Sequence, residues 1–314
     1  MTMPGLPSSP TTASGAPRAG GAGRLGGATV SRIGFGAMQL ERLHGDPDAA
    51  VALLRRAVEL GVDHVDTAEF YGDGAVNAFI ADAFSPADGV TIVSKVGATP
   101  NPQGPVSLRL AQRPDELRAS VEDNLRSLAV DRIDIVNLRR TDSGPGLRAE
   151  GDQVVDLDDQ LAAMTAMRDE GKVGAIGLSS VSLDVVQRAL PAGIVCVQNA
   201  YSLVSRDDDE LLEFCVAHDI AWVPFFPLGS AFAHLPKVTD EPAVIAVAER
   251  LGYSSSQVGL AWLLHRAPNI LLIPGTADAA HLEANVATGQ VVLDEESLES
   301  LGEVPSRSGS VSLS

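Results

Sequence analysis

The sequence predicts an α/β protein in which eight parallel strands, each followed by a helix, close into one (β/α)8 barrel. Short runs rich in Val and Ile alternate with helical patterns, and this alternation repeats eight times. Hydrophobic residues make up 45% of the chain while aromatic residues make up 4%, so aliphatic side chains must fill the core. Parallel strands buried on both faces have this composition. A length of 314 residues suits a barrel that folds as a single domain.

The strand candidates are apolar runs that end in polar residues. In chain order they are RIGFGAM, HVDTA, VTIVSK, IDIVNLR, VGAIGLS, IVCVQNAY, AWVPFF and ILLIPG. A doubly wound dinucleotide-binding sheet would have fewer strands and a Gly-x-Gly-x-x-Gly turn after the first one, where this chain has GFGAMQL. The count of eight therefore favours the closed barrel.

Helical patterns separate these runs. In PDAAVALLRRAVELG, Val51, Leu54 and Val58 recur at helical spacing and Gly61 marks the end of the helix. Further helices are predicted over PDELRASVEDNLRSL and DLDDQLAAMTAMRDEGK. Two helices follow the seventh strand, and a serine cluster precedes the second of them as its N-cap.

The first 25 residues are rich in Pro, Gly, Ser and Thr and predict a disordered tail before a barrel over residues 26–314. This segment has no apolar stretch of a secretory signal, and no run in the chain has the length of a membrane span. Cys196 and Cys215 have no spacing typical of a disulfide framework or a structural zinc site. We therefore expect a cytoplasmic protein.

The charge of the chain narrows its partners. There are 41 acidic and 23 basic residues, a formal net charge of −18. Such a field repels nucleic-acid backbones and anionic lipid surfaces. A small molecule is the expected ligand, and the sequence does not indicate an oligomeric state.

In a (β/α)8 barrel the chemistry lies at the C-terminal ends of the strands. The predicted strand ends carry a carboxylate, a phenol, an ammonium and guanidinium groups, whereas the opposite ends carry nothing comparable. In order, the residues at this rim are Asp66, Tyr71, Lys95, Arg139, Arg140, Ser179, Ser180, Gln198, Asn199, Tyr201, Phe225, Phe226, Gly275 and Thr276.

The first three of these residues predict a proton donor. A free phenol has a pKa of about 10 and is a weak acid at neutral pH. A neighbouring Lys95 ammonium would lower the pKa of the Tyr71 phenol, and Asp66 would keep that ammonium charged and oriented. The alternative interpretation is a buried ion pair beside an unrelated surface tyrosine.

The eighth strand predicts an anion site. In ILLIPGTADAAHLEAN an apolar strand runs through a Gly-Thr turn into a helix, whose N-terminal amides attract negative charge. A phosphate at this end, a proton donor near strands two to four and Phe225 as a flat platform between them suggest a dinucleotide. An ordinary strand-to-helix turn is the alternative.

Seven of these segments together resemble the aldo-keto reductases. They are GFGAMQL, VDTAEFYG, the strand ending in SKVG, GLSS, VQNAYS, PFFPLG and IPGTADAAHLEAN, and they follow the family's order over nearly the whole chain. The resemblance implies NADPH-dependent reduction of an aldehyde or ketone in a TIM barrel, with NADH less favoured. It implies catalytic roles for Asp66, Tyr71 and Lys95, with Tyr71 as the general acid.

The resemblance also implies a cofactor site. Ser179 and Gln198 would hold the nicotinamide carboxamide, and Phe225 would stack on the nicotinamide ring. Ser180, Pro227 and Leu228 are further residues expected to bind the cofactor. The segment around the adenosine phosphate would comprise Gly275, Thr276, His281, Glu283 and Asn285. Many members have Lys and Arg where this chain has Gly275 and His281, which departs from the usual binding of a 2′-phosphate.

The fourth catalytic position also departs from the family. Most members have a histidine at the end of strand four, in a pattern that resembles Asp-x-x-x-x-His. Counting from Asp134 places Arg139 at the position of this histidine. Arginine only donates and keeps its charge, whereas histidine can also accept and titrate. Arg139 could polarise the carbonyl oxygen or bind an anionic group of the substrate, such as a phosphate or a carboxylate.

Three functions follow from this replacement. Carbonyl reduction is favoured, because Asp66, Tyr71 and Lys95 remain and a proton donor has no use in a pure binding module. The alternatives are an NADP(H)-binding regulatory module and a C=C (enone) reductase, both of which occur in the family. The strand ending VNLR resembles bacterial members that reduce pyridoxal, so a small aromatic aldehyde is the substrate expected first. No pair of histidines fits a metal site, and the mechanism needs no metal.

Overall fold

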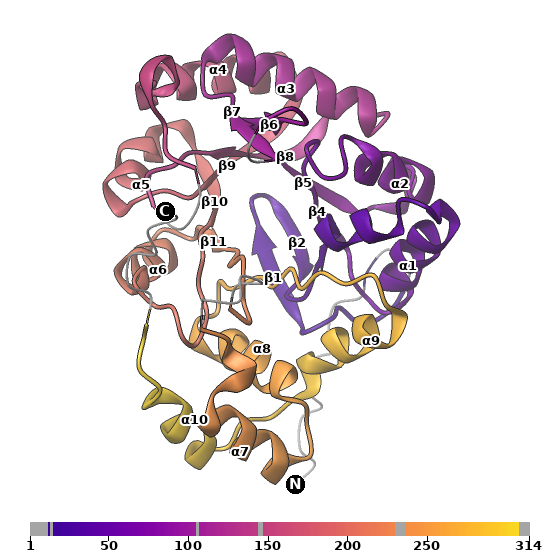
Figure 1. Ribbon diagram of the computed structural model, residues 1–314, viewed down its shortest axis with the longest axis vertical. Coiled ribbons are helices and arrows are strands. Elements are labelled where there is room, and N and C mark those ends of the chain that lie inside the picture. Colours follow the sequence, from indigo (N-terminus) through magenta and orange to yellow (C-terminus); the bar gives the residue numbers. More distant parts are fainter. Residues whose placement is uncertain (1–11, 13–14, 105–106, 144–146, 230–235, 308–314) are drawn as a thin grey trace, which may run out of the picture.

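The computed structural model describes residues 12, 15–104, 107–143, 147–229 and 236–307. A parallel sheet of seven strands forms its centre, and each strand neighbours the next one along the chain apart from the small hairpin between β5 and β8 (Figure 1). These strands are β3 (Phe35–Gly36), β4 (His64–Asp66), β5 (Thr91–Val96), β8 (Ile133–Arg139), β9 (Val173–Ser179), β10 (Ile194–Gln198) and β11 (Ala221–Trp222).

The eighth apolar run closes this sheet into a barrel. The Leu271 N–H donates to the Trp222 carbonyl at 2.9 Å, and the Leu272 N–H donates to the Arg32 carbonyl at 2.8 Å. Residues 270–272 thus bridge β11 to the segment before β3, although they form isolated bridges and not a full ladder. Pro274 comes two residues after Leu272 and has no N–H to extend the ladder. The predicted (β/α)8 architecture is confirmed.

Helices surround the barrel (Figure 1). Asp46 is the N-cap of α1, and its carboxylate accepts the Ala49 N–H. Ser254 is the N-cap of α8 and forms a capping box with Gln257, as the serine cluster predicted. The α-helices are α1 (Pro47–Glu59), α2 (Ala75–Ala83), α3 (Pro114–Ser127), α4 (Leu157–Asp169), α5 (Leu183–Ala189), α6 (Asp209–Ala217), α7 (Pro242–Leu251), α8 (Ser255–Arg266), α9 (Ala279–Ala287) and α10 (Glu295–Gly302). Short 3-10 turns are η1 (Ala37–Leu43), η2 (Pro86–Asp88), η3 (Gly151–Gln153), η4 (Leu190–Ala192), η5 (Val238–Asp240) and η6 (Thr288–Gln290).

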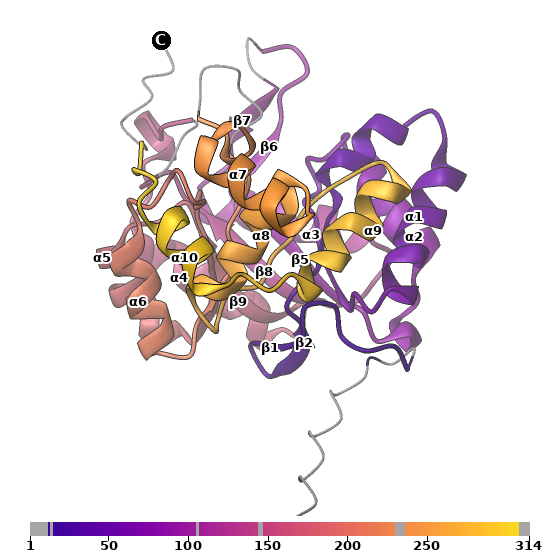
Figure 2. The ribbon, with the colours of Figure 1, turned by 90° about the horizontal axis from the view of Figure 1, so that it is seen from below.

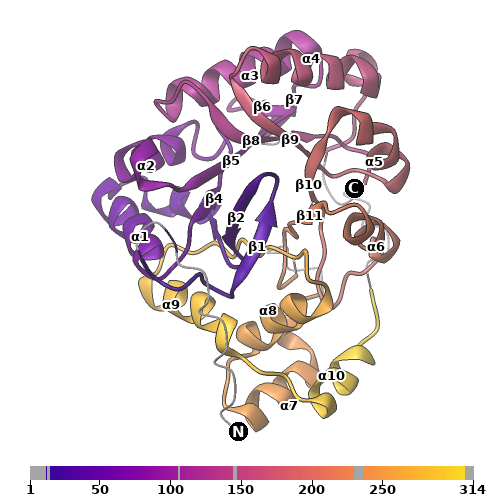
Figure 3. The same cartoon turned by 180° about the vertical axis from the view of Figure 1, so that it is seen from behind.

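A hairpin of β1 (Ala22–Leu25) and β2 (Ala28–Ser31) closes the N-terminal end of the barrel (Figure 3). The predicted tail boundary at residue 25 is therefore wrong, because β1 lies inside that segment and Leu25 is buried; residues 1–11 lie outside the described residues. The two-residue Gly26–Gly27 turn makes the hairpin possible. The hairpin packs into a small apolar cluster formed by Leu25, Val30, Val93, Ile135, Cys196, Ala221, Val223 and Leu271.

A second hairpin, β6 (Ala98–Pro100) with β7 (Leu108–Leu110), lies at the opposite end of the molecule (Figure 2). Because β6 directly follows β5, this end is where the barrel strands finish and where the site is expected. Among the described residues, no helix is long and apolar enough to cross a membrane.

Candidate active site

A buried ion pair forms the base of the site. Lys95 at the end of β5 places Nζ 2.5 Å from Asp66 Oδ1 at the end of β4, and Nζ also donates to the Thr67 carbonyl at 3.0 Å. Gln198 at the end of β10 donates from Nε2 to the other carboxylate oxygen, Oδ2, at 2.6 Å. Both oxygens of Asp66 are therefore engaged. Burial by itself lowers the pKa of the Lys95 ammonium, but Asp66 and Tyr71 outweigh it, and that pKa lies above its ordinary value.

Tyr71 lies in the turn between β4 and α2, next to this pair. Lys95 Nζ is 5.1 Å from the centre of the Tyr71 ring, and Phe70 packs edge-on against the ring at 5.2 Å. Burial raises the pKa of the Tyr71 phenol, and the charges of Lys95 and Arg139 oppose that rise. The expected lowering of this pKa is therefore wrong in direction: loss of water around the phenol outweighs the positive neighbours.

Arg139 ends β8 and faces the same end of the barrel. Its backbone pairs with Ser179 of β9, and its carbonyl accepts a hydrogen bond from Gln112 Nε2 at 2.8 Å. Its side chain is half-buried, and the buried Nη1 has no hydrogen-bond partner among the described residues. Burial lowers the pKa of this guanidinium, while Tyr71 acts in the opposite direction. The positive charge of Arg139 thus interacts electrostatically with the phenol.

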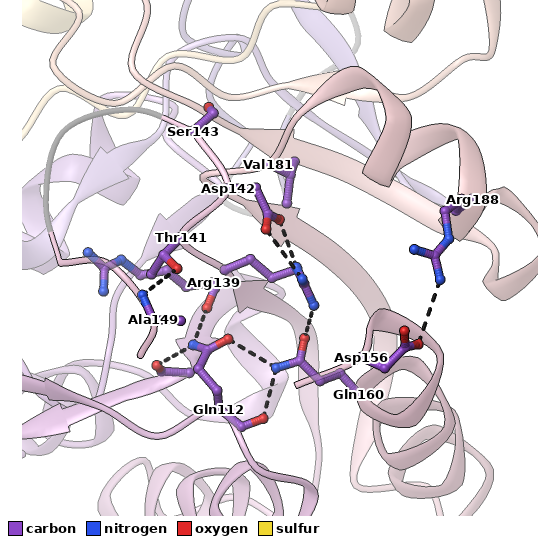
Figure 4. A network of polar contacts seen from close by, with 12 residues as sticks. Gln112, Arg139, Thr141, Asp142, Ser143, Ala149, Asp156, Gln160, Val181 and Arg188 are labelled. Carbon is purple, nitrogen blue, oxygen red and sulfur yellow. Dashed lines mark hydrogen bonds and ion pairs between the residues drawn. The ribbon is translucent and has the colours of Figure 1, made fainter. Parts of the chain in front are cut away.

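Buried amide side chains hold the end of β8 in place (Figure 4). Gln112 Nε2 also donates to the Gly97 carbonyl at 2.6 Å, so one amide joins the ends of β5 and β8. Gln160 of α4 donates to the Gln112 carbonyl at 2.8 Å and to its side-chain oxygen at 3.0 Å. Gln112 and Gln160 are both buried. These hydrogen bonds therefore hold the backbone of Arg139, from which its side chain extends, in a fixed position.

Arg140, the next residue along the chain, is not a free surface charge. Its side chain is 15% exposed and pairs with Asp142, whose Oδ2 accepts from Nε at 2.7 Å. A further nitrogen of Arg140 donates to the Gln160 side chain (Figure 4). The two adjacent arginines thus differ, because Arg140 has a counter-charge and Arg139 has none among the described residues.

The residues predicted to hold the carboxamide end of a cofactor lie together. Ser179 ends β9 and Ser180 follows it in a left-handed conformation, φ 56°, with its N–H donating to the Gln198 carbonyl at 3.0 Å. Gln198 donates from Nε2 to Asp66, and its buried Oε1 has no donor among the described residues. Phe225, Pro227 and Leu228 are half-buried after β11.

Several residues of the predicted phosphate segment also make contacts within the protein. Thr276 is buried, but Asp278 caps α9 by accepting the His281 N–H at 2.9 Å, so a carboxylate already occupies one of the helix amides. His281 is 78% exposed, and Glu283 pairs with Arg56 of α1 at 2.7 Å. Gly275 instead allows close packing: a Cβ there would lie 2.6 Å from the Gly36 carbonyl oxygen. Asn285 is half-buried in α9.

The two cysteines have no part in the proposed site. Cys196 and Cys215 are free and buried, and burial raises the pKa of the Cys215 thiol to about 12. Among the described residues, no group of three or more His, Cys, Asp or Glu side chains could hold a metal ion.

Comparison with known proteins supports the arrangement. Residues 32–305 match the sequence profile of the Aldo/keto reductase family. The chain belongs to the aldo/keto reductase family. It is 44% identical over 285 residues to a pyridoxine 4-dehydrogenase of Escherichia coli strain K12, covering 88% of this chain and 96% of that protein. It is also 35% identical over 306 residues to an uncharacterized oxidoreductase of Schizosaccharomyces pombe, covering 94% of each.

Solved aldo-keto reductase structures share this fold. A Klebsiella pneumoniae aldo-keto reductase in complex with NADPH superposes with a TM-score of 0.75 at 26% identity, covering 91% of this chain and 96% of that one. A second structure from the same organism, in complex with NADP and acetate, has a TM-score of 0.75 at 27% identity, covering 91% of this chain and 96% of that one. The chain is thus an oxidoreductase of this family, as its motifs predicted.

Proposed function

We propose that this aldo/keto reductase uses NADPH to reduce a small aromatic aldehyde of the pyridoxal type to its alcohol. The observation that carries the proposal is the Lys95 ammonium, which lies between the Asp66 carboxylate and the Tyr71 ring at the C-terminal end of the barrel. The 44% identical relative named a pyridoxine 4-dehydrogenase supports the substrate class.

The side chains of this site divide the work of proton transfer. Tyr71 gives its phenolic proton to the carbonyl oxygen as negative charge develops there. Lys95 stabilises the phenolate that Tyr71 becomes, and Asp66 keeps Lys95 charged and aimed. The raised pKa of the Tyr71 phenol keeps the proton on the enzyme until the substrate oxygen becomes basic. NADPH, when bound, supplies the hydride to the carbonyl carbon.

The residues at the ends of β9, β10 and β11 fit such a cofactor. Gln198 Oε1 is a buried acceptor to which the described residues donate no hydrogen bond, and a carboxamide N–H would satisfy it. We assign Ser179 and Ser180 to the same end and the half-buried Phe225 to the nicotinamide ring. Gly275, Thr276 and Asn285 line the phosphate end in this proposal, and Pro227 and Leu228, which follow Phe225 in the chain, complete the cofactor site.

Replacement of Tyr71 by Phe tests the proposal. We expect kcat for aldehyde reduction to fall by about 10²- to 10⁴-fold because the general acid is lost. Cofactor affinity, measured by quenching of protein fluorescence on NADPH titration, should change little. Full turnover by Tyr71→Phe would remove Tyr71 from the mechanism.

A substrate panel separates this function from its alternatives. NADPH oxidation is followed with pyridoxal, with other aromatic aldehydes and with enones. Turnover of aldehydes supports carbonyl reduction, whereas turnover of enones alone indicates C=C reduction. Tight NADPH binding without turnover of any of them indicates a regulatory module.

A further inference from the structure

Arg139 carries a positive charge that no carboxylate of the described residues neutralises. No ion pair or side-chain hydrogen bond joins its guanidinium to any described residue, and Nη1 is buried without a partner. The segments outside the described residues contain no Asp or Glu, so every acidic side chain of the protein is accounted for. A partly buried charge without a partner lowers the stability of the folded protein, so folding alone gives no reason to keep one.

Two other partly buried arginines have hydrogen-bond or ion-pair partners within the protein. Arg32 donates to the carbonyls of Ile270, Leu264 and Ala267 at 3.2, 2.7 and 2.8 Å. Arg140 pairs with Asp142 at 2.7 Å. Arg139 differs from both, which points to a group that comes from outside the chain.

The charges of the site leave room for one negative group. Asp66 and Lys95 neutralise each other at 2.5 Å, and both Asp66 oxygens are engaged. Tyr71 is neutral before the reaction, so the guanidinium of Arg139 is the charge left over. An anion of the substrate would satisfy it, because a charge-assisted hydrogen bond to Arg is roughly twice as strong as a neutral one.

The position of Arg139 fixes where that anion must be. Its backbone is held by the hydrogen bond from Gln112 and by pairing with Ser179, so its side chain extends from a rigid strand end. Asn137, two residues before Arg139 on β8, pairs with Lys95 of β5, whose Nζ lies 5.1 Å from the centre of the Tyr71 ring. Arg139 therefore ends its strand beside the group that protonates the carbonyl oxygen in the proposed reaction, and its charge interacts with Tyr71. A substrate whose only anionic group is a phosphate far from its carbonyl would not contact both the Arg139 guanidinium and the Tyr71 phenol. The anionic oxygen must therefore lie close to the carbonyl oxygen.

We propose that Arg139 binds an anionic oxygen that lies side by side with the substrate's carbonyl oxygen, as in an aromatic aldehyde with an ortho phenolate or in a 2-oxo acid. This rests on the proposed carbonyl reduction. Hydride still adds to the carbonyl carbon, the proton still comes from Tyr71, and the anionic oxygen is unchanged in the product. Arg139 is then the residue that selects the substrate.

Matched pairs of substrates test this selection. 5-nitrosalicylaldehyde and 4-hydroxy-3-nitrobenzaldehyde are both phenolates at neutral pH, with the charge ortho to the aldehyde in the first and para in the second. Phenylglyoxylate and its methyl ester test the 2-oxo acid in the same way. The two pairs distinguish the two sources of the anionic oxygen. The measurement is kcat/KM with NADPH for each compound.

In the wild type we expect kcat/KM for the adjacent anion to exceed that of its partner compound by about 10- to 100-fold in at least one pair. Arg139→Met should abolish that preference while still reducing the para isomer, and Arg139→Lys should restore part of it. Arg188→Met is the control, because it removes one charge from an arginine that is 53% exposed; it should keep the preference.

Two results overturn the proposal: no preference in the wild type while all aldehydes are reduced, or the same preference in Arg139→Met. Absence of reduction of every carbonyl compound would instead contradict the proposed function itself. Folding gives an independent readout. Arg139→Met should be at least as stable as the wild type, because it removes an uncompensated covered charge; strong destabilisation would identify Arg139 as structural and overturn the proposal.

Discussion

At the residue scale, the replacement that we propose at Arg139 exchanges a histidine, which titrates near neutrality, for an arginine, which does not. Histidine has an ordinary pKa of about 6.5, whereas arginine stays charged throughout the range in which proteins fold. Arg139 therefore keeps a constant positive charge beside Tyr71 at every physiological pH. The remaining groups of the site, Lys95 and Tyr71, both have pKa values raised above their ordinary range.

This combination predicts the pH dependence of the reaction. A phenol with a raised pKa stays protonated as pH rises, so the proton donor is lost only above a pH of about 10. We expect kcat/KM for reduction of p-nitrobenzaldehyde, which does not titrate, to be flat from about pH 6 to 8. In Arg139→His, the rate should fall as pH rises through about 6.5, because the positive charge beside Tyr71 is then lost. An inflection near neutrality in the wild type would contradict this account.

At the element scale, the ends of β5 and β8 meet at a glycine. Gly97 has φ 106°, and a Cβ there would lie 2.3 Å from the Arg139 carbonyl oxygen and 2.8 Å from Gln112 Nε2. The contact is with backbone, so a side chain at this position cannot be accommodated by a rotamer change. Gly97 thus permits the bond from Gln112 that holds the strand carrying Arg139.

Gly97→Ala should disturb both stability and catalysis. We expect the free energy of unfolding to fall by about 1–3 kcal/mol from the left-handed conformation, with more from the clash. Displacement of Arg139 should reduce kcat/KM by up to about 10²-fold. Gly171→Ala is the matched control, since φ is 82° but no atom lies within 4 Å of the added Cβ. It should lose stability alone; equal loss of activity in both variants would show that the contact with Arg139 is unimportant.

The elements also show how far the sequence predicts this protein. β8 and β9 begin and end at the predicted residues because their apolar runs stop at Arg139 and Ser179. β11 is shorter than predicted, since Pro224 cannot donate to a ladder. The β1–β2 hairpin was missed although its Gly-Gly turn between two short runs signals one.

The side chains of the candidate site were predicted less completely than its strands. The pair of Lys95 with Asp66 follows from strand ends that meet at one rim, and the sequence predicted both residues. The bonds from Gln198 to Asp66 and from Gln112 to the Arg139 carbonyl had no signal, because a buried amide has no periodicity or motif. The pKa direction of Tyr71 was wrong, because the loss of water around the ring is a property of packing.

At the scale of the whole molecule, we expect one end of the barrel to serve catalysis and the other to serve stability. The proposed catalytic residues lie where the strands finish. The β1–β2 hairpin lies at the other end of the barrel (Figure 2), where its side chains join an apolar cluster. Leu25 of this hairpin is 2% exposed and contributes to that cluster. In barrels of this kind, the N-terminal face serves stability and the C-terminal face serves chemistry.

Leu25→Ala should therefore separate stability from activity. Truncation of a buried leucine leaves a cavity and should cost about 2–5 kcal/mol of unfolding free energy, measured by urea denaturation. kcat/KM of the folded fraction should stay at the wild-type value, because no strand end that carries a catalytic group is moved. Val292→Ala, at a side chain that is 76% exposed, should change neither quantity. A large loss of kcat/KM in folded Leu25→Ala would mean that the hairpin transmits its packing through the barrel to Lys95 and Arg139, and that the two ends are not independent.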